Sequence, residues 1–156
     1  MNIYIIAVGT KMPDWVNQGV DEYLRRMPNE CQVKFIELPL GQRAKSKNTK
    51  QAMQQEEKSI LAAIPANAYV IAMDVKAKIW STEILSEKMQ DWMQSGKDVA
   101  LLVGGPDGMT QACIARANEK WSLSNLTLPH PLVRILLAEQ LYRGLMIIKN
   151  HPYHKS

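Results

Sequence analysis

Residues 99–108 have the sequence Val-Ala-Leu-Leu-Val-Gly-Gly-Pro-Asp-Gly, in which an aliphatic run passes directly into a glycine turn. A short run of β-branched and aliphatic residues bounded by turn formers predicts a buried strand. Glycine has no Cβ atom, so it reaches backbone angles closed to other residues and lets a ligand approach the main chain. The stretch therefore predicts a buried strand whose carboxyl end opens into a loop.

Strands of this kind alternate with helices along the chain. Aliphatic and β-branched clusters predict strands at 2–8, 33–38, 69–73 and 99–103. Helical spacing of apolar residues predicts helices at 13–27, 49–64, 82–94 and 131–149. Pro13 suits a first helical turn and Ser81 suits a helix N-cap. The alternation predicts an α/β fold with a mostly parallel sheet and helices on both of its faces.

The composition is typical of one folded domain. Of the 156 residues, 46% are hydrophobic and 22% are charged, so we expect a single domain spanning residues 1–156. The longest aliphatic runs are far too short to cross a bilayer, and the amino terminus lacks a signal-peptide pattern. We therefore expect a cytoplasmic protein without a membrane partner. Cys31 and Cys113 are isolated, which argues against a disulfide framework or a zinc knuckle.

Positive charge is concentrated in one segment. The net charge is only +4, but residues 41–50 carry four cations and no acidic residue: Arg43, Lys45, Lys47 and Lys50. Such a cluster can neutralise RNA phosphates and release their condensed counterions. A solvated basic loop has the same composition, so both interpretations stay open.

The glycine turn is a candidate ligand site. Ligands of open parallel sheets bind beyond the carboxyl ends of the strands, which places Met73 and Gly104 at the mouth of a predicted site. The turn matches neither the dinucleotide pattern GxGxxG nor a P-loop. A purely structural turn remains the alternative.

The helix predicted at 131–149 is apolar on more than one stripe, so it should be buried on two sides. One side can face the sheet, and we expect the other to pack on an identical subunit across a two-fold axis. Burial within one larger core is the alternative. Glu139 and Arg143 are spaced to pair along this helix.

The tail at 150–154, Asn-His-Pro-Tyr-His, combines a proline, an aromatic ring and two imidazoles. This composition favours a folded, functional end over a frayed one. Two histidines without a nearby third ligand make a weak zinc site, so we expect no metal.

Several motifs occur in an order that points to one family. They are VGTK at 8–11, EYLRR at 22–26, GGPDG at 104–108, LTLPHP at 126–131, EQLYR at 139–143 and NHPYH at 150–154. Over essentially its full length, the chain resembles the bacterial RlmH family of SPOUT, or trefoil-knot, methyltransferases. These enzymes methylate N3 of pseudouridine 1915 in helix 69 of 23S ribosomal RNA on the assembled ribosome.

The resemblance implies a deep carboxyl-terminal trefoil knot that binds S-adenosyl-L-methionine as methyl donor, without a metal. The donor contacts that it implies are Met73, Gly104, Leu123, Ser124, Asn125, Leu126, Thr127 and Leu128. It further implies a homodimer formed through the helix at 131–149, with 23S ribosomal RNA as partner and no DNA. Because no added RNA-binding domain is evident, we expect recognition of a preformed ribosomal shape.

Methylation at N3 requires that a weakly acidic imide be oriented and lose its proton. We expect Arg143 to hold phosphate or stabilise negative charge on the base, and Tyr153 and His154 to position the base or accept its proton. His130 is expected to fix the donor loop. Two other classes remain open: an RNA-binding module without chemistry, and a dinucleotide-dependent Rossmann enzyme, which the missing GxGxxG pattern disfavours.

Overall fold

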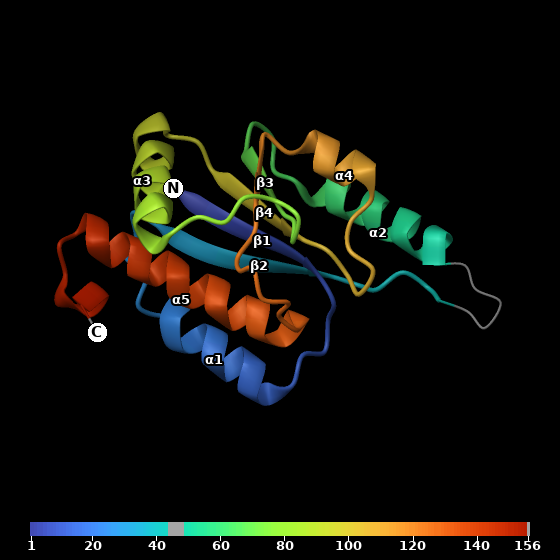
Figure 1. Cartoon of the computed structure of the whole chain (residues 1–156), viewed down its shortest axis with the longest axis horizontal. Coiled ribbons are helices and arrows are strands. Elements are labelled where there is room, and N and C mark those ends of the chain that lie inside the picture. The colour runs from blue at the N-terminus through green and yellow to red at the C-terminus, as the bar shows by residue number, and fades with distance from the viewer. Residues whose placement is uncertain (44–48, 156) are drawn as a thin grey trace.

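The computed structural model describes residues 1–43 and 49–155. Its elements in chain order are β1 (Asn2–Val8), α1 (Asp14–Leu24), β2 (Gln32–Leu38), α2 (Thr49–Ala63), β3 (Tyr69–Met73), α3 (Thr82–Ser95), β4 (Val99–Val103), α4 (Gln111–Arg116), β5 (Glu119–Trp121), α5 (His130–Ile148) and the 3-10 helix η1 (Pro152–Lys155). Within this part of the chain, five parallel strands form one sheet in the order β2-β1-β4-β3-β5 (Figure 1). The predicted parallel α/β architecture is confirmed.

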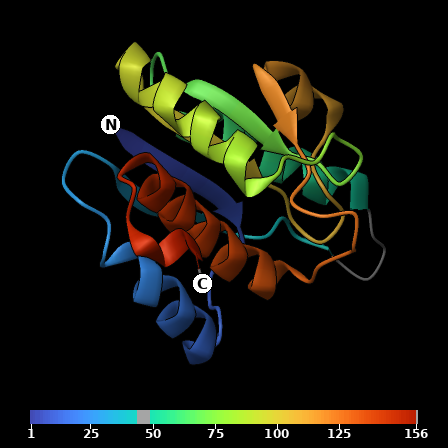
Figure 2. The same ribbon diagram turned by 60° about the vertical axis from the view of Figure 1, so that its left-hand side comes forward.

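Helices cover both faces of the sheet, as predicted. Ile3 and Ile5 of β1 belong to the core layer shared with α1, α3 and α5, whereas Ile6 and Val8 belong to the layer shared with α2 and α4. Figure 2 shows α1, α3 and α5 together on one side of the strands. All residues of the central strand β4 are buried, which explains its uninterrupted aliphatic sequence.

Local sequence signals set the helix boundaries. The Ser81 hydroxyl accepts a hydrogen bond from the Ile84 amide at 3.1 Å, which confirms it as the N-cap of α3. Pro13 lies immediately before α1 rather than inside its first turn. Helix α1 also ends at Leu24, earlier than predicted, because the next residues form tighter turns before Pro28, a residue that disfavours helix in its predecessor.

Helix α5 lies on the sheet between α1 and α3. The Ser86 hydroxyl of α3 donates to the Gly144 carbonyl at 3.0 Å, and Tyr142 packs on Tyr23, one residue before the end of α1. Much of the second apolar side of α5 is therefore covered by the chain itself, which weakens the argument that a partner subunit must cover it. Leu132 and Leu136 nevertheless remain 40% and 37% exposed on its outer face.

Candidate active site

A cavity of about 560 Å³ opens where β3, β4 and β5 end. Its walls are formed by the segments that follow these strands and by the first turn of α5. The lining positions are 73–75, 103–109, 121–124, 126, 128–130 and 133. The volume lies within the range of roughly 300–1,000 Å³ typical of small-molecule and cofactor sites.

The structure places most of the predicted donor contacts on this cavity. Those that line it are Met73, Gly104, Leu123, Ser124, Leu126 and Leu128. Asn125 and Thr127 belong to the same segment but are not among the lining residues. Sequence reasoning missed Trp121 in the wall, because the short strand β5 that carries it was not predicted.

The glycine turn is both a structural requirement and part of the cavity wall. A Cβ atom on Gly104 would lie 2.7 Å from the Met109 Cγ and 2.8 Å from the Gly108 carbonyl carbon. Gly108 has a φ of 82°, and its amide donates to the Gly105 carbonyl at 3.0 Å. The turn can therefore be both structural and ligand-binding. Its residues line the cavity.

Backbone and hydroxyl contacts hold the segment after β5 in place. The Ser122 amide donates to the Lys78 carbonyl at 3.0 Å, and the Ser122 hydroxyl donates to the Ser124 carbonyl at 3.1 Å. The Leu126 amide in turn donates to the Ser124 hydroxyl at 2.9 Å. The Leu126 side chain is 74% exposed, so it presents apolar surface at the mouth of the cavity.

His130 connects the cavity to a buried arginine. Arg134 is 2% exposed, donates from Nε to the His130 Nε2 at 3.0 Å and from Nη2 to the Gly9 carbonyl at 2.6 Å, and pairs with Glu37. Burial and the Arg134 cation lower the pKa of His130, against a hydrogen bond to the Gly104 backbone that favours the protonated ring. His130 is expected from the sequence to fix the donor loop that precedes it; the structure shows its contact with the glycine turn instead, through the Gly104 backbone.

A second cluster lies at the other end of α5. Tyr153, in η1, donates from its hydroxyl to the Glu139 Oε2 at 3.0 Å, and the Arg143 Nε donates to the same oxygen at 2.9 Å. The Arg143 Cζ lies 4.9 Å from the centre of the Tyr153 ring. The predicted pairing of Glu139 with Arg143 is confirmed. Glu139 also binds Tyr153, a contact that sequence reasoning missed. The His154 side chain lies outside the described residues.

Tyr153 is a hydrogen-bond donor rather than a base in this arrangement. Burial, followed by the hydrogen bond to Glu139, raises the pKa of Tyr153 to about 12. The phenol therefore stays protonated at neutral pH, which fits a positioning role better than proton acceptance.

Within one chain, the cavity lies far from the second cluster, which is formed by Glu139, Arg143 and Tyr153 and is called the tail cluster below. His130 and Arg143 are thirteen positions apart on α5, which corresponds to about 20 Å along the axis at the usual helical rise. Arg143 and Tyr153 accordingly are not among the residues that line the cavity. The structure brings most of the predicted donor contacts together but leaves Arg143 and Tyr153 apart from them.

The basic segment is only partly a solvated surface. Arg43 is engaged by two carboxylates, from Glu56 at 2.8 Å and Asp107 at 3.0 Å, whereas Lys50 is exposed. Lys45 and Lys47 lie outside the described residues.

Neither a membrane span nor a metal centre is found in the described part of the chain. No helix among residues 1–43 and 49–155 is long and apolar enough to cross a membrane. The same residues contain no group of three or more His, Cys, Asp or Glu side chains that could hold a metal ion.

Comparison with known proteins identifies the family. A family model described as "Predicted SPOUT methyltransferase" matches residues 1–154. The chain belongs to the SPOUT methyltransferase family. Over 156 residues it is 54% identical to the ribosomal RNA large subunit methyltransferase H of Hahella chejuensis, with 100% of both chains covered. It is equally identical to the protein of that name from Saccharophagus degradans over 155 residues, or 99% of this chain and 100% of the relative. These relatives confirm the resemblance that the motifs indicated.

Two solved structures are similar in fold. A probable methylase family protein from Haemophilus influenzae matches with a TM-score of 0.57 and 12% identity, over 95% of this chain and 66% of that one. TrmJ from Z. mobilis matches with a TM-score of 0.50 and 14% identity, over 92% of this chain and 68% of that one. At these identities the comparison concerns the fold alone.

Proposed function

We propose that this SPOUT protein is a cytoplasmic, S-adenosylmethionine-dependent methyltransferase that modifies N3 of pseudouridine 1915 in 23S ribosomal RNA on the assembled ribosome. The observation that carries the proposal is full-length identity of 54% to a ribosomal RNA large subunit methyltransferase H, in a family whose members transfer methyl groups. A cavity of cofactor size at the carboxyl ends of the strands supports it.

The residues around the cavity fit the donor. Gly104 allows the glycine turn to close on itself in the cavity wall, since a Cβ there would clash with Met109 and Gly108. Met73 and Leu128 line the cavity with apolar surface suited to an adenine ring, while backbone groups of 123–128 can bind its polar edge and the ribose. S-adenosylmethionine, when bound, supplies an electrophilic methyl group on its sulfonium. We also propose that the last part of the chain passes through an earlier loop as a knot around this site.

The tail cluster is proposed to act on the RNA base. The Tyr153 phenol, kept protonated beside Glu139, can donate a hydrogen bond that orients the base. The Arg143 cation can stabilise the negative charge that develops on the carbonyls flanking N3 as the proton leaves. Since Tyr153 is a poor base, we assign proton acceptance to His154.

A homodimer would join the two halves of the site. Two α5 helices packed antiparallel across a two-fold axis would bring the Arg143 end of one protomer to the His130 end of its partner. The half-exposed Leu132 and Leu136 on the outer face of α5 offer apolar surface for this contact. The proposed active site is therefore composite, with the donor in one protomer and the base held by the tail of the other.

Calorimetric titration of the purified protein with S-adenosylmethionine tests the donor assignment. An RNA-binding module would not bind the donor, and a dinucleotide-dependent enzyme would bind a dinucleotide instead. Mass mapping of 23S ribosomal RNA from cells that lack the gene then tests the substrate. We expect loss of one methyl group on a single pseudouridine; an unchanged modification pattern would contradict the proposal.

A further inference from the structure

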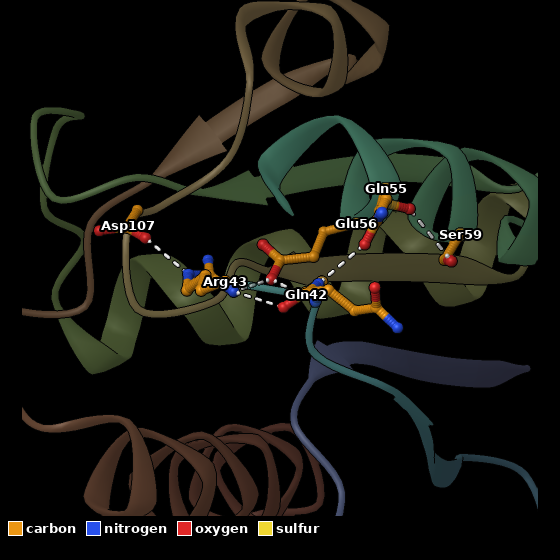
Figure 3. Close-up of polar contacts among 7 residues, drawn as sticks. Gln42, Arg43, Gln55, Glu56, Ser59 and Asp107 are labelled. Carbon is orange, nitrogen blue, oxygen red and sulfur yellow. Dashed lines mark hydrogen bonds and ion pairs between the residues drawn. The ribbon is translucent and has the colours of Figure 1, made fainter. Parts of the chain in front are cut away.

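One arginine outside the donor-contact set links the cavity to a buried carboxylate. Arg43 donates from Nε to the Asp107 Oδ2 at 3.0 Å and from Nη1 to the Glu56 Oε2 at 2.8 Å (Figure 3). Asp107 belongs to the glycine turn and lines the cavity, whereas Glu56 lies on α2 and is 2% exposed. A single guanidinium thus connects the donor pocket to α2.

Glu56 fixes the position of Arg43. Its Oε2 also accepts a hydrogen bond from the Gly41 amide at 2.9 Å, and its Oε1 has no hydrogen-bond partner among the described residues. A carboxylate buried in this way needs a cation against it, because an uncompensated charge is strongly unfavourable away from water. Arg43 is the cation paired with it in the described part of the chain.

The packing around this pair leaves little freedom. A Cβ on Gly105 would lie 3.0 Å from the Glu56 Oε1, and a Cβ on Gly41 would lie 2.1 Å from the Ala52 carbonyl oxygen. Both the glycine turn and the segment before Arg43 therefore pack closely on α2. Next along this helix, Glu57 accepts a hydrogen bond from Thr110, just beyond the turn. Glu56 and Glu57 thus hold the chain at and just after the turn, Glu56 through Arg43 and Glu57 through Thr110.

We propose that Arg43 is a positioning residue for the methyl-donor pocket: held by Glu56, it fixes Asp107 and with it the glycine turn in the donor-binding conformation. The inference rests on the proposed function for the identity of the donor. Without Arg43, the turn would become ordered only when the donor binds. Donor affinity would then fall, because the site must lose conformational freedom on binding. Catalysis would be preserved once the donor is bound.

The test compares donor affinity, turnover and thermal stability in matched variants. Arg43→Gln removes the link, and Lys58→Gln removes the same charge from an exposed position on α2, so it controls for general loss of attraction to RNA. Asp107→Asn weakens the link from the cavity side, where the carboxylate is 41% exposed, so the fold should tolerate it. Combining Arg43→Gln with Glu56→Gln removes the uncompensated buried charge and should restore stability.

We expect Arg43→Gln and Asp107→Asn each to raise the dissociation constant of S-adenosylmethionine about fivefold or more, the size of a typical coupling between sites. In Arg43→Gln, turnover at saturating donor should change less than roughly twofold, because Arg43 orders the donor site before methyl transfer begins. Joining Arg43→Gln to Asp107→Asn should add little, since both break one link. Lys58→Gln should bind the donor as the parent does.

Two results would overturn the inference alone: unchanged donor affinity in folded Arg43→Gln protein, or affinity restored together with stability when Glu56→Gln is added. The second would mean that Arg43 acts only through stability. A parent protein that binds no S-adenosylmethionine would instead refute the proposed function, and this inference with it.

Discussion

At the scale of single residues, His130 joins the buried Arg134 to the glycine turn through contacts that depend on its protonation state. Its Nε2 accepts a hydrogen bond from Arg134, so the neutral ring carries its proton on Nδ1 and can offer that proton to the Gly104 backbone. Protonation at Nε2 would remove this acceptor and place a second cation against a buried guanidinium. Burial and Arg134 together lower the pKa of His130, which keeps the ring neutral under ordinary conditions.

Acid should therefore weaken donor binding through His130. Its folded-state pKa lies below the ordinary value of 6.5, so below about pH 6.5 the unfolded chain takes up the proton first. The stabilising contribution of the neutral ring is fully present above that pH and declines as the pH falls toward the folded-state pKa. We expect S-adenosylmethionine affinity and melting temperature to fall together in this window, measured by calorimetry and thermal unfolding.

His130→Gln provides the matched control for this prediction. A glutamine can accept from Arg134 and donate to the Gly104 carbonyl, but it does not titrate. The variant should bind the donor with less change between about pH 7.5 and pH 5.5 than the parent does. Equal acid sensitivity in both proteins would show that another group is responsible.

At the scale of elements, the end of α5 determines where the tail lies. The His151 amide donates to the Met146 carbonyl at 2.8 Å and the Asn150 amide donates to the Ile147 carbonyl at 3.0 Å, with Asn150 in the left-handed region at a φ of 55°. This is the hydrogen-bond pattern of a Schellman helix end. It reverses the chain, so that η1 folds back and Tyr153 reaches Glu139.

Substitution of Asn150 tests whether the end of α5 is needed for turnover but not for donor binding. Asn150→Ala places a Cβ-bearing residue without a local polar side chain in the left-handed region and should reduce the free energy of unfolding by about 1 kcal/mol, whereas Asn150→Gly should be close to neutral. Chemical denaturation measures both. Turnover should fall in Asn150→Ala with little change in donor affinity. A loss of donor affinity equal to the loss of turnover would contradict this division.

Elements with strong periodic patterns were predictable, and short or irregular ones were not. The sequence indicated β1 to β4 and the longer helices because each buries an aliphatic face. Strand β5 has the sequence Glu-Lys-Trp, and two charged residues in a strand of three leave no apolar pattern to detect. It is held instead by pairing with β3, which local sequence cannot reveal. Helix α4 has six residues, which is too short for a periodic apolar face to mark it after its N-cap, Thr110.

In the candidate site, too, the parts with a local sequence signal were predictable and the parts held by long-range contacts were not. The glycine turn and the segment at 123–128 were found because turn residues and family motifs mark them. The sequence did not connect two arginines to the site, although each contacts a residue that lines the cavity: the buried Arg134 through His130, and the partly buried Arg43 through Asp107. Their partners are distant in sequence, as with Arg134 and Gly9, and long-range polar contacts leave no periodic signature.

At the scale of the whole molecule, α5 connects the cavity to the tail cluster, and one chain keeps the two apart. Its first turn borders the cavity through His130, and its last turns carry Arg143 beneath η1. The separation of about 20 Å is too great for a methyl group to pass between them within one protomer. A partner subunit that places its own tail cluster beside this cavity would bring the donor and the RNA base together, as the proposed chemistry requires.

Complementation between two damaged proteins tests this composite site. Gly104→Ala distorts the glycine turn that lines the donor pocket, because the new Cβ would lie 2.8 Å from the Gly108 carbonyl carbon, and Arg143→Gln disables the tail. Each variant alone should be nearly inactive. Co-expressed chains that pair at random should recover about a quarter of parental activity, because half of the dimers are mixed and one of their two sites is intact. Adding Leu136→Glu to both chains should abolish both the dimer, measured by analytical ultracentrifugation, and the recovery. If mixed dimers form but activity does not recover, each site lies within a single chain.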